Sequence, residues 1–479
     1  MELAVVCGVG RRRACLAVAV LMAFVPVLGA GQILDKAAEK TTAVANYHQM
    51  QEALGIKELR PPVSQNQKSA HPANFDEAKA NPFLELPDPL RLQSGQPVKT
   101  PADWWQKRRP EIMELFNREL LGQVTADVPR VDWKLLSQSR ETAAGIPVVL
   151  KHLSGAVDNR AYPLLKVAID LVVVTPAEAK KKVPVVMELA FSSENMAVTG
   201  KYFPEMLPGG KGNEGPSWQE QVLERGWGYA ILLPTSFQED SPAGLRRGLI
   251  GLASKGQPRK PEDWGALRAW AWGASRAMDY FESDTAIDAS RVAIEGHSRF
   301  GKTALVAMAI DQRFAVAYIS SAGTGGDKLY RHIYGEQLEN LAGPNSWHWM
   351  AGNFLKYAGP LGVNDLPVDA HELLALCAPR PVFIGVGSST AGDAWADPKG
   401  EFLAAMAAGP VYRLLGVHAL NTKQMPPMES ALTHGELAFR QHPYGHTPGP
   451  NWPAFLDFAA RYLDRAQKSY RSGPYRFGN

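Results

Sequence analysis

The sequence predicts an α/β fold: a three-layer sandwich in which a mostly parallel central sheet carries helices on both faces. From about residue 130 onward, short apolar runs alternate with longer segments of helical periodicity. Residues 167–174 and 183–189 are rich in β-branched side chains and nearly continuous in apolar character, which is typical of strands buried on both faces. No internal repeat divides the chain, so the alternation is expected to build one body.

The expected elements follow one another in strand–helix order. The expected strands lie in residues 148–150, 167–174, 183–189, 228–233, 292–295, 315–320, 381–387 and 411–415. The expected helices lie in residues 218–225, 261–282, 301–310 and 452–462, with one more beginning near Lys399. Residues 327–370 interrupt this order and are rich in Trp, Tyr, Asn and Gly. We expect them to form an inserted, cap-like region over the top of the sheet, where α/β folds bind substrates.

The first thirty residues are predicted to be a signal peptide and not part of the fold. Three arginines at 11–13 precede the apolar run 14–28, and Gly29 and Ala30 supply small residues for cleavage. The alternative is a membrane anchor, but the run is short for a span and contains Pro26. The mature protein is therefore expected to be secreted or periplasmic, with no membrane contact after cleavage.

The remaining chain divides into two parts. Residues 31–100 are expected to be an N-terminal extension, and residues 101–479 are expected to be the catalytic domain. The stretch from about Arg60 to Asp103 is rich in Pro and polar residues and has little periodicity. It is expected to wrap around the catalytic body or to be partly disordered.

Composition excludes several classes of function. Loss of residues 1–30 removes three Arg and one Glu and lowers the formal net charge from +3 to +1, which gives no support for a nucleic-acid partner. Cys7 and Cys15 leave with that segment, and the apolar surroundings of Cys377 indicate buried packing rather than a nucleophile. No H-x-H or H-E-x-x-H spacing appears, so no metal or other cofactor is expected. We expect a monomer.

A strand–turn–helix segment around Ser298 predicts the nucleophile. An apolar strand leads into Gly296-His297-Ser298, and a helix of small residues follows. This context is typical of the nucleophile elbow of the α/β-hydrolase fold, in which the N–H of the next residue, Arg299, points at a developing oxyanion. The usual G-x-S-x-G pattern is not met, because the second glycine is Gly301, one place late. The alternative is a turn in which the serine only caps a helix.

The histidine and the acid of a triad are expected later in the chain, in that fold's order of serine, acid and histidine. His446 is the preferred base because it lies in a Gly-His loop shortly before the last helix; His442 and His434 are rivals. The acid is expected in the loop after residues 381–387, which contains Asp393 and Asp397. Asp393 is preferred because it lies nearer to the strand, whereas Asp397 precedes a proline and is expected to cap the following helix.

These segments resemble carbohydrate esterase family 15, the glucuronoyl esterases, and its bacterial members in particular. The resemblance spans roughly residues 100–465, and its motifs are G-H-S-R-F-G-K at 296–302, S-A-G-T-G-G at 321–326, D-A-W-A-D-P-K-G-E at 393–401 and Gly445-His446. It implies an α/β-hydrolase that cleaves the ester between 4-O-methyl-glucuronic acid of glucuronoxylan and lignin alcohols. It also implies roles for single residues: Ser298 as nucleophile, His446 as base, Arg299 at the oxyanion, and Lys302, Glu336 and Trp395 in substrate binding.

One position departs from the family pattern. Many members carry a catalytic Glu just before the S-G-x-G-G-like stretch, and this chain has Ser321 there. A hydroxyl cannot supply the negative charge that stabilises an imidazolium, so the departure favours Asp393 as the acid.

Two other functions stay open beside this one. The chain could be an acetyl-xylan esterase or general carboxylesterase, although such an enzyme has no evident need for the two cations Arg299 and Lys302. It could also be a non-catalytic carbohydrate-binding pseudoesterase, which an intact Ser298, His446 and Asp393 disfavours. Residues 347–349, Trp-His-Trp, are expected either to line the inserted region for xylan or lignin or to pack within it.

Overall fold

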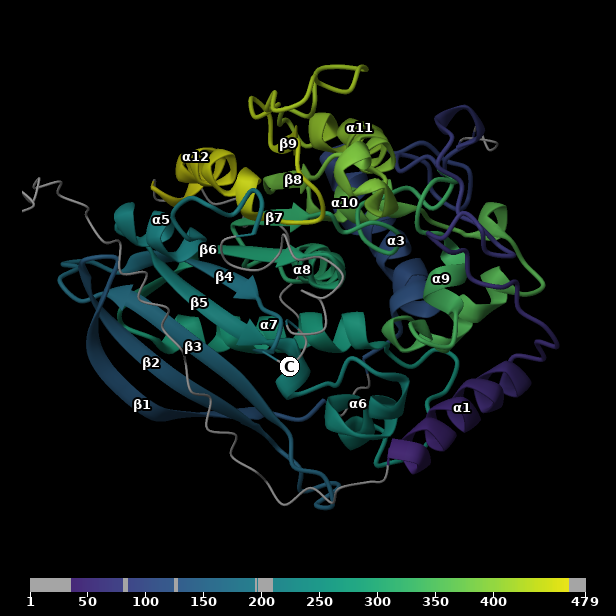
Figure 1. Ribbon diagram of the computed structural model, residues 1–479, viewed down its shortest axis with the longest axis horizontal. Helices are drawn as coiled ribbons and strands as arrows, with labels where there is room; N and C mark the ends of the chain where they lie inside the picture. Colours follow the sequence, from purple (N-terminus) through teal and green to yellow (C-terminus); the bar gives the residue numbers. More distant parts are fainter. Residues whose placement is uncertain (1–35, 81–84, 125–127, 194–195, 197–209, 465–479) are drawn as a thin grey trace, which may run out of the picture.

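A central sheet organises the structure, which is a computed structural model describing residues 36–80, 85–124, 128–193, 196 and 210–464 (Figure 1). Within these residues the sheet has nine strands in the order β1-β2-β3-β5-β4-β6-β7-β8-β9. The neighbours from β5 to β9 pair in parallel, whereas β1, β2, β3 and β5 pair antiparallel. The strands are β1 Val131–Ala143, β2 Ile146–Val157, β3 Ala168–Pro176, β4 Val183–Leu189, β5 Gly228–Leu233, β6 Ile287–His297, β7 Val316–Ser320, β8 Val382–Val386 and β9 Leu437–Gln441.

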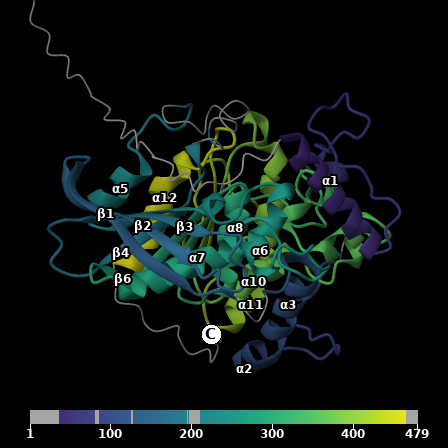
Figure 2. The same cartoon turned by 90° about the horizontal axis from the view of Figure 1, so that it is seen from below.

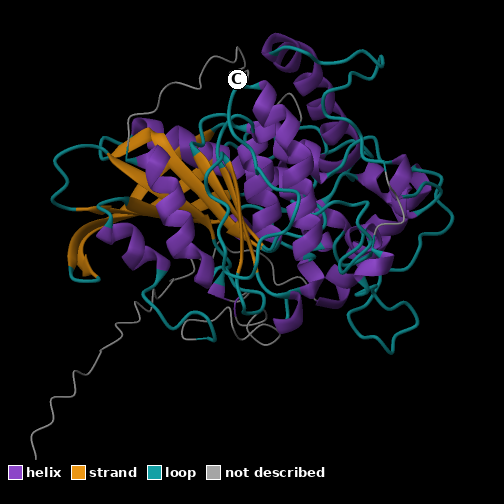
Figure 3. Ribbon diagram, turned by 90° about the horizontal axis from the view of Figure 1, so that it is seen from above, coloured by secondary structure: helices purple, strands orange, loops and turns teal. Residues whose placement is uncertain are grey.

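Helices cover both faces of this sheet, which confirms the predicted three-layer α/β fold (Figure 3). Alternate residues of the strands enter two different cores: Met187, Ile294 and Ile319 pack in the larger core, and Val186, Ala293 and Tyr318 pack in the smaller one with α5 and α12. The helices are α1 Lys36–Ala53, α2 Pro101–Asp103, α3 Arg109–Leu115, α5 Trp218–Glu224, α6 Gly248–Ala253, α7 Ala266–Ser283, α8 Arg299–Ile310, α9 Leu338–Ala342, α10 Ala370–Cys377, α11 Pro398–Leu414 and α12 Trp452–Leu463.

One predicted strand is wrong. Residues 411–415 are not a strand but the end of α11 and the residue after it. Their burial explains the error: Val411 and Tyr412 are adjacent and both buried, whereas Arg413 is exposed, a pattern that suits a helix face and not the alternation of a strand. The last strand is β9, which the sequence analysis did not identify.

Residues of the predicted N-terminal extension pack against the segment predicted to be an insertion. The side chain of Tyr47, in α1, donates to the Ala342 carbonyl at 2.7 Å, and the Arg60 guanidinium pairs with Glu339 at 2.9 Å. Further along, the Asn74 amide donates to the carbonyl of residue 333 at 2.6 Å. In Figures 1 and 2, α1 lies at the opposite end of the molecule from β1 and β2.

The predicted signal peptide lies outside the described residues. In the part of the chain that the structure describes, no helix combines the length and the apolar character that crossing a membrane requires.

Candidate active site

Ser298 lies in a strained turn between β6 and α8. Its backbone has φ 57° and ψ −126°, an unfavourable conformation for a residue with a side chain, and it persists because the flanking strand and helix fix it. The Ser298 N–H donates to the Ser320 carbonyl on the neighbouring strand at 2.8 Å. The side chain makes no capping hydrogen bond to α8, contrary to the helix-cap alternative. The geometry is that of a nucleophile elbow.

The two glycines of this turn are required by close backbone contacts. A Cβ atom on Gly296 would lie 2.1 Å from the carbonyl oxygen of Phe300, and one on Gly301 would lie 2.9 Å from that of Ser320. The second glycine, Gly301, therefore allows α8 to lie close to the end of β7. This contact explains why position 301 is a glycine.

His446 and Asp393 form a buried hydrogen-bonded pair. His446 Nδ1 lies 2.7 Å from Asp393 Oδ1, and the Asp393 side chain is fully buried. A carboxylate in that position keeps the proton on Nδ1, which leaves Nε2 as the basic nitrogen. The His446 ring also lies 4.3 Å, centroid to centroid, from the ring of His297, the residue just before Ser298. The pair thus lies beside the nucleophile turn.

The neighbouring His297 does not compete with His446 for a proton. Burial, and next the proximity of His446, hold the pKa of His297 well below its ordinary value. Its Nδ1 lies 2.9 Å from the Ser320 hydroxyl. A neutral His297 adds no positive charge against an imidazolium that forms at His446.

The other oxygen of Asp393 accepts two hydrogen bonds. The Ser321 hydroxyl and the Gly387 N–H each donate to Asp393 Oδ2 at 2.7 Å. Ser321 therefore contacts the very carboxylate that was predicted in place of the missing Glu. The sequence analysis did not assign this role to Ser321, because only the fold brings β7 next to the loop after β8.

The rival acid has a different position. Asp397 accepts from the Gly400 N–H at 2.9 Å and caps α11, as predicted, while its Oδ2 lies 2.6 Å from His332 Nδ1. Its backbone is left-handed, with φ 62°. Asp397 pairs with a histidine of residues 327–370, and Asp393 pairs with His446.

The rival histidines are also separate from this pair. His442 is buried, its Nε2 lies 2.9 Å from the Thr447 carbonyl, and burial lowers its pKa to about 4. His434 is exposed. Neither has a hydrogen bond to Asp393 among the described contacts.

Arg299 begins α8 and lies between two aromatic rings. Its guanidinium carbon is 5.6 Å from the ring centroids of both Phe191 and Trp349, and its Nη1 donates to Asp240 Oδ2 at 2.6 Å. About a third of the Arg299 side chain is exposed. Asp240, in the loop after β5, was not identified from the sequence, where it is one carboxylate in a polar loop with no motif around it.

Two of the three predicted substrate-binding residues pair through their side chains, and the backbone of Trp395 contacts one of them. Lys302 Nζ donates to Glu336 Oε2 at 2.9 Å and to the Ala322 carbonyl. The Glu336 N–H donates to the Trp395 carbonyl at 3.0 Å, so the residues 327–370 and the acid loop lie side by side there. The charged pair can bind sugar hydroxyls through hydrogen bonds, and a half-buried indole such as that of Trp395 offers a face for packing on a sugar.

The chain is similar to known carbohydrate esterases in sequence and in structure. A family model described as "Glucuronyl esterase, fungi" matches residues 259–416. Carbohydrate esterase MZ0003, from an unknown prokaryotic organism, is 34% identical over 81% of this chain and 92% of its own length. The structure of a CE15 glucuronoyl esterase from Teredinibacter turnerae T7901 matches with a TM-score of 0.82 and 44% identity, over 88% of this chain and 99% of that one.

The chain belongs to carbohydrate esterase family 15. The resemblance seen in the sequence is thereby confirmed. A glucuronoyl esterase from Solibacter usitatus is a further CE15 neighbour, with a TM-score of 0.69 and 33% identity over 80% of this chain and 99% of that one. The chain is a carboxylic ester hydrolase with the α/β-hydrolase fold of this family.

The Trp-His-Trp segment of this CE15 member is buried and packs within the protein, which is one of its two expected roles. Trp347 is buried and packs on Arg259 and Tyr47. The side chains of His348 and Trp349 instead reach Asp240, at 3.0 and 2.7 Å. One tryptophan therefore packs, and its two successors contact the partner of Arg299.

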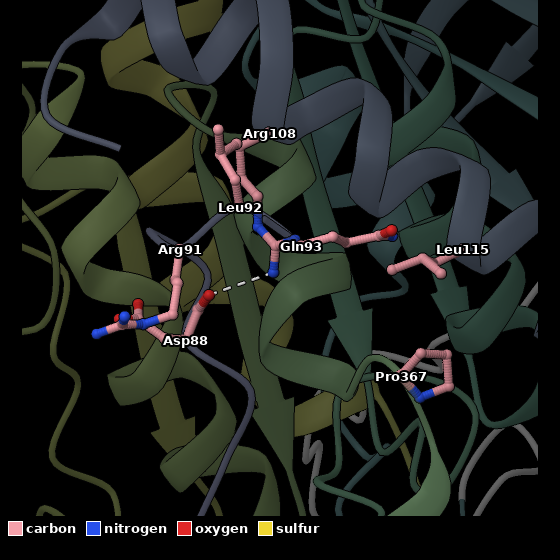
Figure 4. Close-up of a pocket in the computed structure, with 7 residues that line it drawn as sticks. All are labelled: Asp88, Arg91, Leu92, Gln93, Arg108, Leu115 and Pro367. Carbon is pink, nitrogen blue, oxygen red and sulfur yellow. Dashed lines mark hydrogen bonds and ion pairs between the residues drawn. The ribbon is translucent and has the colours of Figure 1, made fainter. Parts of the chain in front are cut away.

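Two other features lie apart from this site. A cavity of about 340 Å³ shares no lining residue with the groups described above; it is lined by Asp88, Arg91, Leu92, Gln93, Arg108, Leu115 and Pro367 (Figure 4). Cys377 is buried, and burial raises the pKa of its thiol to about 12, so it is un-ionised at neutral pH. Within the described ranges, no group of three or more His, Cys, Asp or Glu side chains could hold a metal ion.

Proposed function

We propose that this CE15 member is a serine esterase that cleaves the ester between 4-O-methyl-glucuronic acid of glucuronoxylan and lignin alcohols. The 2.7 Å bond between His446 and Asp393 beside the strained Ser298 turn carries this proposal. Related proteins support the substrate, since one from Schizophyllum commune is named 4-O-methyl-glucuronoyl methylesterase and is 27% identical over 69% of this chain and 74% of its own.

The reaction uses the side chains in two steps. Ser298 attacks the ester carbonyl while His446 takes the hydroxyl proton, and His446 then gives that proton to the leaving alcohol. Water, activated by the same histidine, cleaves the acyl-enzyme on Ser298. Asp393 holds the tautomer of His446 and stabilises the imidazolium that forms in each step.

The oxyanion of each step is stabilised at the start of α8. The Arg299 N–H lies at the N-terminus of that helix, where the helix dipole favours negative charge. The partly exposed guanidinium of Arg299 adds a second source of positive potential.

The uronic acid ring is bound, in this proposal, by Lys302, Glu336 and Trp395. The ammonium and the carboxylate are already paired at 2.9 Å, so both are oriented before the substrate arrives. Pre-oriented groups lose less conformational entropy on binding than free side chains.

Two assays test the proposal. Ser298→Ala should abolish hydrolysis of benzyl glucuronate, and activity that survives this change would contradict the acyl-enzyme mechanism. The unmodified enzyme should also prefer benzyl glucuronate to acetylated xylan. A preference for the acetyl ester would favour the acetyl-xylan or general carboxylesterase function, and no turnover of any ester would favour a carbohydrate-binding pseudoesterase.

Residues 1–30 are proposed to be a signal peptide, on their sequence alone. The mature protein would then begin near residue 31 and be secreted or periplasmic, and we expect it to be a monomer. Mass spectrometry of the exported protein measures the cleavage site, and light scattering measures the mass in solution.

A further inference from the structure

Both cations at the start of α8 are paired with carboxylates. Arg299 pairs with Asp240 at 2.6 Å, and Lys302 pairs with Glu336 at 2.9 Å. The indole of Trp349 lies next to both, 5.6 Å from the Arg299 guanidinium and 6.0 Å from the Lys302 ammonium. The site therefore holds two cations close together with little net positive charge.

Asp240 is held more firmly than a surface partner would be. Its side chain is 7% exposed and accepts three hydrogen bonds, from Arg299 at 2.6 Å, Trp349 at 2.7 Å and His348 at 3.0 Å. Burial opposes its ionisation, but the hydrogen bond from His348 and the charge of Arg299 together hold the pKa of Asp240 well below its ordinary value. Asp240 is an anion throughout the neutral range.

The charge on Asp240 is matched by Arg299. Burial lowers the pKa of His348, so this imidazole is neutral and donates through Nε2–H without adding charge. One guanidinium therefore faces one carboxylate; about a third of the Arg299 side chain is exposed, whereas its Nε is buried and has no hydrogen-bond partner among the described residues.

We propose that Asp240 is a positioning residue that fixes the Arg299 guanidinium and compensates its charge, so that the anionic product of the reaction is released instead of being retained. This inference rests on the proposed function, because it concerns a uronate product. The substrate is a neutral ester, whereas the product is a carboxylate, which is ionised at neutral pH.

An uncompensated guanidinium would bind that carboxylate strongly. Arginine forms two parallel hydrogen bonds to a carboxylate, and each is strengthened by the charges. Asp240 already occupies Nη1 of Arg299 and Nε is buried, so the product cannot form a two-point contact at either edge of the guanidinium without displacing a neighbour. Developing negative charge on the carbonyl oxygen is smaller and shorter-lived, and it needs only a positive potential at a fixed place.

The position of the Arg299 guanidinium depends on residues 327–370. Trp349 contributes both a ring that packs on the guanidinium and an N–H that holds the carboxylate. Phe191 packs on the guanidinium at 5.6 Å as well. Asp240 and the two rings together restrict the rotamer of Arg299, whose long side chain would otherwise lose entropy in each turnover.

Charge and shape at position 240 can be separated by two variants. Asp240→Asn keeps the shape and removes the charge, so the Kd for D-glucuronate, measured by titration calorimetry, should fall about tenfold. The kcat for benzyl glucuronate should fall as well, because product leaves slowly. Asp240→Glu keeps the charge and moves it, so it should bind D-glucuronate like the unmodified enzyme while losing kcat. Neutral D-glucose serves as the uncharged ligand, whose binding should not change.

The adjacent Glu239 offers a matched control. Its carboxylate pairs with Arg247 and is 45% exposed, so Glu239→Gln makes the same charge change one residue away. Its Kd for D-glucuronate should stay that of the unmodified enzyme. Thermal unfolding identifies a variant that does not fold; in that event Asp240→Ser, a smaller neutral replacement, provides the same comparison.

A double-mutant cycle tests whether Asp240 acts through Arg299. In an Arg299→Ala background, Asp240→Asn should no longer tighten binding of D-glucuronate. An unchanged Kd in the single variant, or the same tightening in both backgrounds, overturns the inference. Failure of the proposed function has a different signature, because the unmodified enzyme would then leave benzyl glucuronate intact whatever the Kd values are.

Discussion

Replacing a carboxylate by an amide can show which of the two candidate acids, Asp393 or Asp397, acts in the triad. Asp393→Asn leaves an amide whose oxygen can still accept from Ser321 and Gly387, which both contact Oδ2 now. The amide nitrogen then faces His446 Nδ1, where Oδ1 lies at 2.7 Å. An N–H donor there forces the proton onto Nε2, and this tautomer cannot take the proton of Ser298.

The expected loss is large. The equivalent change in a serine-protease triad lowers kcat about 10⁴-fold, which corresponds to about 5.5 kcal/mol of transition-state stabilisation. We expect a loss of about 10³- to 10⁴-fold for Asp393→Asn. The fold should persist, because both hydrogen bonds to the second oxygen survive.

Asp397→Asn is the matched variant. Asparagine caps helices as well as aspartate does and tolerates the left-handed backbone found there, φ 62°. The change removes the charge that faces His332 at 2.6 Å, so we expect the free energy of unfolding to fall by about 1–2 kcal/mol and kcat to change less than about threefold.

Steady-state kinetics on benzyl glucuronate at pH 7, with thermal unfolding of both variants, provides the measurement. A loss of kcat in Asp397→Asn equal to that in Asp393→Asn would refute the reasoning. So would an Asp393→Asn enzyme with nearly full kcat, since the bond to His446 would then have no role in the reaction.

Three further perturbations test other contacts. Ser321→Ala removes one donor from Asp393, and kcat should fall about tenfold without loss of fold, because hydrogen bonds to charged groups are worth about 1.5–3 kcal/mol; kinetics and circular dichroism check this. Burial lowers the pKa of His442 to about 4, so its neutral form contributes stability that is complete above pH 6.5 and lost as the pH falls through 4, about 3 kcal/mol in all. Urea unfolding at pH 7 and pH 4 measures this loss, which His442→Gln should reduce. Arg60→Ala removes four hydrogen bonds to residues 339–361 and should lower Tm by a few degrees in calorimetry.

Ser321→Ala and Arg60→Ala each have a matched control. Ser388→Ala removes a hydroxyl of the same loop whose hydrogen bonds, among the described residues, go to Thr390, so kcat should stay unchanged. Arg91→Ala removes an exposed guanidinium with local contacts only, and Tm should hold. Equal effects in a test and its control, or no change in the pH dependence on replacing His442, would contradict the physical reasons given.

The sequence predicted the nucleophile turn because its chemistry is local. A strand, a serine between glycines and a helix of small residues occupy one short stretch, and every constraint on the turn comes from neighbours in the chain or the next strand. The preference for Asp393 over Asp397 also came from local position. The hydrogen bond to His446, across 53 residues, is what distinguishes the two carboxylates in the structure.

The contacts that the sequence did not predict are long-range or contradict local patterns. Asp240 meets Arg299 across 59 residues, and nothing in its own loop distinguishes it from Glu239. The strand expected at 411–415 was an apolar stretch that serves one face of α11. In each instance, tertiary packing decides between alternatives that local composition leaves equal.

The bonds from α1 and Arg60 to residues 327–370 have a consequence for exchanging parts between relatives. Arg60 alone reaches the carbonyls of residues 357, 359 and 361, and Tyr47 reaches that of residue 342. The same residues 327–370 include Trp349, which donates to the carboxylate of Asp240. A chimaera that takes this segment from another family member would leave the donor's loops on a foreign N-terminus. The portable module is therefore residues 327–370 together with residues 36–80, two pieces far apart in sequence that have to be transplanted as one.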